Sequence, residues 1–176
     1  MTKMNEDNKN LYIGIDMGLN GGICVIDDDE VIGRMTPMFI VEAKSKTLDK
    51  AELIKFFNYY HNGYDIHVFV EQTHTMPHHG GKCNYSIGEQ TGIIHTILTM
   101  LQVPFEVISA KKWQKELFKG FTYGDTKEAS ISFCTRKYPD QSFKATERCK
   151  KHHDGMTDAC CIAIYGKRLM VGKKDG

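Results

Sequence analysis

Four acidic side chains, Asp16, Glu71, Asp154 and Asp158, stand at positions that point to chemistry. Asp16 and Glu71 each end a short apolar run, where burying a carboxylate alone is costly. Asp154 and Asp158 are four residues apart, so one face of a helix would present both, and like charges at this spacing repel unless a cation compensates. Carboxylate oxygens are ligands that Mg²⁺ and Mn²⁺ prefer. The sequence therefore predicts a divalent-metal site built from these four residues.

A pair of metal ions about 3.5–4 Å apart can activate a water on one side of a phosphodiester and stabilise the leaving oxygen on the other. Such a pair needs a bridging carboxylate, and Asp16, at the centre of the set, is expected to fill that role. The acids therefore favour metal-dependent hydrolysis of a phosphodiester.

Simpler roles remain open for two of the acids. Asp16 is also suited to capping a turn at Gly18 or Asn20, and Asp154 to capping the start of a helix. Asp158 has no such alternative, because it lies inside an apolar helical segment.

The apolar runs that lead to Asp16 and Glu71 are typical of core strands. Residues 11–16, 22–26 and 31–35 are predicted to be consecutive antiparallel strands joined by tight turns of Gly, Asn and Asp. The continuous apolar character of residues 67–71 suits a central parallel strand, and residues 105–109 form another strand.

Helices are expected between and after these strands. Asp49 with Glu52, and Asp125 with Glu128, form capping boxes, and Ser86 is expected to cap a further helix. The alternation of strands and helices predicts an α/β fold, a mixed β-sheet of three antiparallel strands followed by parallel strands and flanked by helices. The predicted helices cover residues 49–60, 86–101, 111–118, 125–137 and 154–170.

Several segments, in order, are similar to the motifs of one nuclease family. They are GIDMGLNGGICVID, VFVEQ, GEQTGII, FEVIS followed by KKWQK, and DACCIA. Together they resemble the RuvC family of Holliday-junction resolvases, in the ribonuclease-H-like superfamily, over nearly all of the chain from Leu11 to Met170. Each motif alone is weak, but this set in order at the right intervals is fairly specific. The short, divergent chain is interpreted as a phage or mobile-element member.

The chain departs from the family pattern at two places. Met17 stands where the bacterial enzymes usually carry proline, which changes only the stiffness of the turn. The first acid of the last pair usually lies three residues before the second, whereas here position 155 is Gly and Asp154 lies four before Asp158. Both spacings reach the same helical face. His153 is the alternative to Asp154 as the fourth ligand.

The resemblance implies a ribonuclease-H-like fold and a homodimer that resolves four-way DNA junctions by symmetric nicking. The products would carry 5′-phosphates and 3′-hydroxyls. The resemblance also implies two Mg²⁺ ions per active site, with Mn²⁺ able to substitute, and no nucleotide cofactor. Asp16, Glu71, Asp154 and Asp158 would be both the catalytic residues and the metal ligands.

The resemblance also suggests which residues would contact DNA. The loop of residues 72–84 would face the junction centre, with His74 at the position where the family places an aromatic wedge; a surface histidine without this role is the alternative. Lys127 is the best placed of the candidate phosphate contacts, because it lies beside a helix N-terminus. The candidate contacts are Lys82, Lys111, Lys112, Lys115 and Lys127.

The length of 176 residues and the 41% hydrophobic content suit a single globular nuclease domain over residues 11–170. Residues 1–10 and 171–176 are expected to be disordered and flexible tails. The polar start does not read as a signal peptide, and no apolar run approaches the roughly 20 residues that span a bilayer. A cytoplasmic location is expected, in the host cell if the protein is phage-encoded, without membrane association.

Charge is divided unevenly along the chain. Residues 1–80 carry seven Lys and Arg against twelve Asp and Glu, a net charge of −5. Residues 81–176 carry sixteen against ten, a net charge of +6. The basic C-terminal half suits either phosphate binding or a solvated surface.

The six cysteines lack the paired spacing of structural zinc ligands, so free thiols are expected. A zinc site remains open at two loose groups, Cys149 with His152 and His153, and Cys83 with His78 and His79.

Other functions also fit parts of the sequence. A sugar-kinase-like or actin-like ATPase needs two related domains, and this chain suits one. A non-catalytic DNA-binding module would gain nothing from acids that repel phosphate without metals. A nuclease acting on forks, flaps or RNA/DNA hybrids is an open alternative to the junction substrate.

Overall fold

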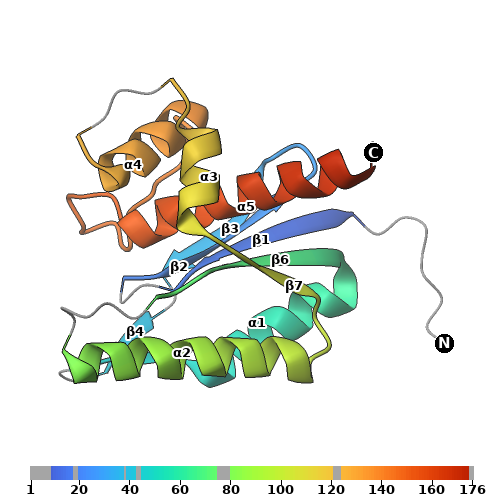
Figure 1. The fold of residues 1–176 in the computed structure, drawn as a ribbon, viewed down its shortest axis with the longest axis vertical. Coiled ribbons are helices and arrows are strands. Elements are labelled where there is room, and N and C mark those ends of the chain that lie inside the picture. The colour runs from blue at the N-terminus through green and yellow to red at the C-terminus, as the bar shows by residue number, and fades with distance from the viewer. Residues whose placement is uncertain are drawn as a thin grey trace.

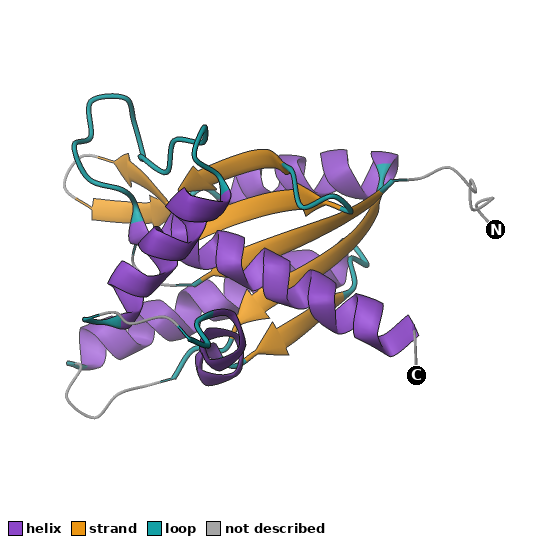
Figure 2. Cartoon of the chain, turned by 90° about the horizontal axis from the view of Figure 1, so that it is seen from above, coloured by secondary structure: helices purple, strands orange, loops and turns teal. Residues whose placement is uncertain are grey.

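The computed structural model describes residues 9–17, 20–37, 39–42, 45–74, 80–120 and 124–174. A mixed five-stranded sheet in the order β3-β2-β1-β6-β7 lies at its centre (Figures 1 and 2). β2 pairs antiparallel with β1 and β3, whereas β6 runs parallel to β1 and β7 parallel to β6. The sheet strands are β1 (Asn10–Asp16), β2 (Gly22–Asp27), β3 (Ile32–Pro37), β6 (Asp65–Glu71) and β7 (Phe105–Ile108).

Helices cover both faces of the sheet, which confirms the predicted α/β fold. α1 and α2 lie on one face, and α3, α4 and α5 lie on the other (Figure 1). The predicted cap of α1 is present, since the Asp49 carboxylate accepts the Glu52 N–H at 2.9 Å. The helices are α1 (Lys50–Gly63), α2 (Gly81–Met100), α3 (Ala110–Leu117), α4 (Thr126–Lys137) and α5 (Asp154–Lys174).

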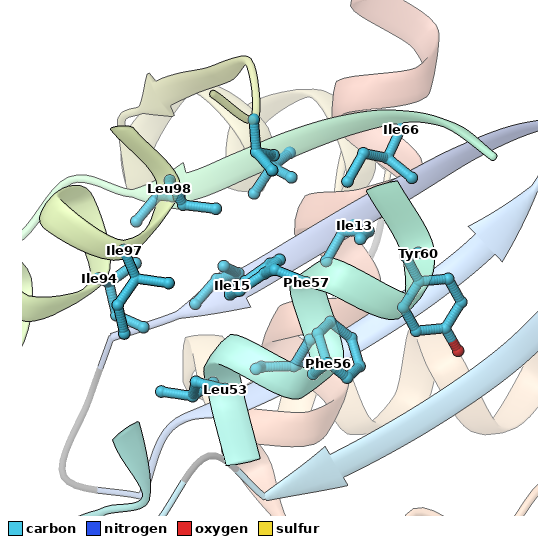
Figure 3. Close-up of a cluster of buried hydrophobic side chains, with 14 of the residues drawn as sticks. Ile13, Ile15, Leu53, Phe56, Phe57, Tyr60, Ile66, Ile94, Ile97 and Leu98 are labelled. Carbon is cyan, nitrogen blue, oxygen red and sulfur yellow. The ribbon is translucent and has the colours of Figure 1, made fainter. Parts of the chain in front are cut away.

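Each face of the sheet has its own apolar core. On one side, β-branched residues of β1 and β6 pack against aromatic and aliphatic residues of α1 and α2 (Figure 3). On the other side, the apolar face of α5 packs against β1 and β2 together with Trp113 and Phe143. Burial of this apolar surface is the main force that holds the helices against the sheet.

α5 lies very close to the centre of the sheet. A Cβ atom on Gly14 of β1 would stand 2.0 Å from the Ala159 carbonyl oxygen, so no larger residue fits there. This approach fixes the height of α5 above β1, and with it the place of the acids that α5 carries.

Some predicted boundaries were wrong. α2 begins at Gly81, five residues before the predicted start, and Ser86 does not cap it but accepts a hydrogen bond from Gln90 inside the helix. A hairpin of β4 (Phe39–Glu42) and β5 (Ser45–Leu48) was not predicted.

The predicted tails lie mostly outside the described residues, which begin at Lys9 and end at Lys174. Asn10 already belongs to β1, and α5 continues past the predicted end at Met170. Within the described part of the chain, no helix is both long and apolar enough to cross a membrane.

Candidate active site

Asp16 and Glu71 lie side by side at one edge of the sheet. They are the last residues of β1 and β6, and these neighbouring parallel strands pair up to Ile15 with Val70, one residue before each acid. The carboxyl ends of parallel strands are where functional groups collect in such sheets. Asp16 is 8% exposed, and Glu71 is partly buried. Each acid ends a core strand, as the sequence predicted.

A backbone contact brings α5 to the same edge. Gly21, in the turn after β1, forms an isolated parallel bridge with Gly155 in the first turn of α5. A Cβ atom on Gly155 would stand 1.8 Å from the Asn20 carbonyl oxygen. Only glycine allows this approach at position 155. Asp154 directly precedes the contact, and Asp158 lies one turn further along.

Replacing Gly155 is expected to separate α5 from the turn after β1. We expect Gly155→Ala to lower the melting temperature and to reduce nuclease activity by more than tenfold, because the added methyl group pushes Asp154 and Asp158 away from Asp16. Thermal melts and cleavage rates check both effects. Gly172→Ala is the matched control, since a Cβ atom there meets nothing within 4 Å. Unchanged stability and activity of Gly155→Ala would contradict this account.

Burial and neighbouring acids raise the pKa values of Glu71 and Asp158. Burial, followed by the charge of Asp16, raises the pKa of Glu71 to about 8, with a further contribution from Asp158. Burial also raises the pKa of Asp158 to about 7, and the charges of Asp16 and Asp154 add to this effect. The raised pKa values mean that Glu71 and Asp158 are costly to ionise beside Asp16, and a bound cation would remove that cost.

Asp154 is in a different electrostatic state. Burial tends to raise its pKa, but the ammonium of Lys127, 2.7 Å from its Oδ2 atom, outweighs that effect and holds the pKa below its usual range. Asp154 Oδ1 accepts the N–H of Gly155 at 3.1 Å. Lys127, predicted as a phosphate contact, is thus an ion-pair partner of a predicted metal ligand in this structure.

His153, rather than Asp154, caps α5. The helix begins at Asp154, and His153 Nδ1 accepts the Met156 N–H at 3.3 Å, the bond that an N-cap side chain makes. The alternative interpretation of Asp154 as the N-cap is therefore not what the structure has. The cap bond also uses the Nδ1 atom of His153, the alternative fourth ligand.

Two fully buried side chains from the other helices support the acids, and neither was predicted. Trp113 of α3 donates its Nε1–H to Glu71 Oε1 at 3.1 Å. Ser130 of α4 makes a hydrogen bond that lowers the pKa of Asp158, and its Oγ lies 3.1 Å from Thr157 Oγ1. The sequence signal was that Trp113 is the single tryptophan of the chain, within a helix rich in charged residues.

Removing the indole N–H should affect the site more than the core. We expect Trp113→Phe to keep most of the packing but to let Glu71 rotate, lowering metal affinity and activity by about 10–100-fold, the usual cost of losing a side chain that orients a ligand. Titration calorimetry with Mn²⁺ measures the affinity apart from activity. Phe118→Leu is the control for altered packing, because it removes a ring whose centroid lies 5.5 Å from that of Trp113. Equal metal affinity in Trp113→Phe and wild type would contradict this role.

The other predicted DNA contacts lie on exposed positions. His74 is exposed in the loop after β6, Lys82 is exposed in the first turn of α2, and Lys111, Lys112 and Lys115 are exposed on α3. Of the loop expected to face DNA, residues 75–79 lie outside the described residues and residues 81–84 belong to α2. Among the described residues, Lys127 is the only predicted phosphate contact that forms an ion pair with a candidate acid.

Among the described residues, no three His, Cys, Asp or Glu side chains are gathered closely enough to hold a metal ion as they stand. Cys149, His152 and His153 therefore do not form a zinc site, and the second loose group includes His78 and His79, which are outside the described residues. The four acids still suit Mg²⁺ in chemistry, because they offer only oxygen ligands and repel one another.

No protein-family model matches the chain, and no curated protein matches it either. Solved structures that are similar in fold include two kinds of resolvase. The yeast mitochondrial Holliday junction resolvase Ydc2 superposes with a TM-score of 0.62 at 12% identity, covering 99% of this chain and 83% of that one. RuvC of Thermus thermophilus gives 0.55 at 16% identity, covering 94% and 96%. T. thermophilus RuvC in complex with a Holliday junction substrate gives 0.53 at 13%, covering 93% and 96%. The fold is therefore the RuvC-like ribonuclease-H fold.

Proposed function

We propose that this chain is a metal-dependent endonuclease that resolves four-way DNA junctions, leaving 5′-phosphates and 3′-hydroxyls. The observation that carries the proposal is that Asp16, Glu71 and Asp158 lie near enough to one another to shift pKa values, with those of Glu71 and Asp158 raised to about 8 and about 7. A cluster of buried carboxyl groups with strongly shifted pKa values is typical of functional sites. The likeness of the fold to proteins described as RuvC and as a Holliday junction resolvase supports the choice of substrate.

Asp16, Glu71, Asp154 and Asp158 would hold the ions. Bound metal would supply an activated water and stabilise the leaving oxygen. The charge of Asp16 acts on the pKa values of both Glu71 and Asp158, which suits a carboxylate shared by two ions. Trp113 and Ser130 orient two of the ligands. Lys127 pairs with Asp154 and would add a positive charge beside the ligands for a phosphate.

The substrate also implies a partner, a second copy of this chain, because a four-way junction with two-fold symmetry is matched by a two-fold dimer. The outer face of α2 supports this proposal. Tyr85 and Met100 are 72% and 76% exposed on it, and Cβ atoms added at Gly88 and Gly92 would meet nothing within 4 Å. An exposed aromatic residue beside small residues suits close packing of another helix.

The function is tested by incubating the protein with labelled junctions, forks, flaps, linear duplex and RNA/DNA hybrid in Mg²⁺. We expect paired nicks at symmetric positions in the junction, ligatable products, and a dimer by light scattering. Preferential cleavage of forks, flaps or hybrids would retain the nuclease but change its substrate. Tight junction binding without any cleavage in Mg²⁺ or Mn²⁺ would instead identify a DNA-binding module.

Metal should stabilise the protein more at high pH than at low pH. Because the pKa of Glu71 in the folded protein, about 8, is above its ordinary value of 4.5, the folded state binds this proton more tightly than the unfolded state. The corresponding stability is present below pH 4.5 and is lost as pH rises through about 8. We expect Mg²⁺ to restore it, so the Mg²⁺-induced rise in melting temperature should be larger at pH 8.5 than at pH 5.5.

Scanning fluorimetry of wild type and Glu71→Gln, with Mg²⁺ or with a chelator, measures this difference. The variant cannot ionise at position 71, so its stability in the chelator should fall less between the two pH values. A Mg²⁺-induced shift that is the same at pH 5.5 and 8.5 in wild type would argue against a metal at these acids.

A further inference from the structure

The loop between α4 and α5 carries positive charge that the candidate active site does not use. Residues 144–152 contain four cations against one acid, Glu147, and all five charged side chains are exposed. The cations are Lys144, Arg148, Lys150 and Lys151. We call residues 144–152 the basic loop.

The four cations of the basic loop form no ion pair with the acids that the structure describes, unlike several other cations on the surface. Within the described parts of the chain, none of the four lies within 4.0 Å of a carboxylate oxygen, whereas Lys9, Lys127 and Lys137 each pair with an acid at 2.5–2.7 Å. Arg168 also pairs with an acid, at 3.7 Å. The charge of the basic loop is therefore available to an external anion.

The basic loop is held in one shape at its base. The His153 N–H donates to the Phe143 carbonyl oxygen at 2.6 Å and closes the loop, and the Phe143 ring is fully buried in the core. Inside the loop, the Cys149 N–H donates to the Thr146 carbonyl oxygen at 3.0 Å. A loop that is already ordered loses less conformational entropy on binding than a flexible one.

The basic loop also lies beside the candidate active site. It leads directly into His153, which caps α5, and into Asp154, the first residue of that helix. In Figure 1 the loop before α5 lies at the same end of the molecule as the ends of β1 and β6. Without metal, the acids of the candidate site repel a phosphate backbone. Cations close to the site offset this repulsion and attract the backbone.

We propose that the basic loop binds the phosphate backbone of the DNA next to the scissile position and supplies a large part of the affinity for DNA. This proposal rests on the proposed nuclease function. Its contacts are with phosphates rather than base edges, so it strengthens binding to junctions and to linear duplex by the same factor. The loop thus adds affinity, and the selection of branched DNA lies elsewhere in the protein.

The test compares two variants that lose the same charge from opposite faces of the sheet. Lys150→Gln/Lys151→Gln removes two cations from the basic loop, and Lys50→Gln/Lys55→Gln removes two exposed cations from α1. Both change the formal net charge from +1 to −1. Affinity for a junction and for linear duplex is measured in Ca²⁺ at several salt concentrations, with gels to show that the DNA stays intact.

We expect the basic-loop variant to bind both DNAs about tenfold more weakly at about 0.1 M salt. The slope of log affinity against log salt concentration should be shallower by about one for each phosphate that the variant no longer neutralises. The α1 variant should match wild type. A four-fold variant, Lys144→Gln/Arg148→Gln/Lys150→Gln/Lys151→Gln, should extend both effects, and circular dichroism checks its fold.

The failure of this inference differs from failure of the proposed function. Wild-type protein that binds junctions while the basic-loop variants bind with equal affinity and equal salt dependence would overturn the inference alone. A loss confined to the junction would overturn the assignment to phosphate contacts. Wild-type protein that binds no DNA at all would overturn the proposed function itself.

Discussion

Asp16→Asn is expected to reduce cleavage of four-way junctions by several orders of magnitude while leaving the fold intact. Asp16 is the acid whose charge acts on both Glu71 and Asp158, so its loss removes the ligand best placed to bridge two ions. Binding of the junction without metal should be unchanged or tighter, because one negative charge beside the phosphate is gone. Single-turnover cleavage in Mg²⁺ and a binding titration in chelator measure the two effects.

A matched control is available on the neighbouring strand. Asp65 begins β6 at the opposite edge of the sheet and is exposed, so Asp65→Asn removes one carboxylate without touching the site. It should cleave at the wild-type rate. An Asp16→Asn protein that also cleaves at this rate would refute the assignment of Asp16.

Asp154→Asn is the second change expected to have a large effect. Because His153 makes the cap bond of α5, the helix should still begin normally when Asp154 loses its charge. The carboxylate paired with Lys127 would then no longer be available to an ion, and activity in Mg²⁺ should fall by orders of magnitude. Mn²⁺ should restore part of it, because that ion tolerates amide and nitrogen ligands better.

His153→Ala is tested beside that variant. It separates the role of His153 as the cap of α5 from a role as the fourth metal ligand. If His153 only caps the helix, its removal should lower the free energy of unfolding by about 1 kcal/mol and leave cleavage of the folded protein nearly unchanged. Melting curves and cleavage rates distinguish the two. An active Asp154→Asn beside a folded but inactive His153→Ala would move the fourth ligand to His153.

Much of the sheet could be predicted because each strand carries its own signal. β1, β2, β6 and β7 are short apolar runs bounded by turn residues, and the capping boxes at Asp49 and Asp125 mark two helix starts locally. The start of α2 could not be found this way. This helix is preceded by Gly80 and has no side-chain cap, so no local signal in the sequence marks its first residue.

The acids were predictable for the same reason, but their supporting partners were not. Asp16 and Glu71 end recognisable strands, and their meeting follows from parallel pairing. Trp113 lies 42 residues from Glu71, and Lys127 lies 27 residues from Asp154. Contacts at such separations are set by how α3 and α4 pack against α5, which no local pattern in the sequence encodes.

The bridge between Gly21 and Gly155 links an early turn of the chain to its last described helix. During synthesis, a ribosome has made Asp16 and Glu71 long before it reaches Asp154 and Asp158. A nascent chain, or a fragment cut within residues 144–152, therefore contains half of the carboxylates without the other half. Under the proposed function, cleavage would therefore begin only once α5 has docked on the sheet and brought Asp154 and Asp158 to Asp16 and Glu71.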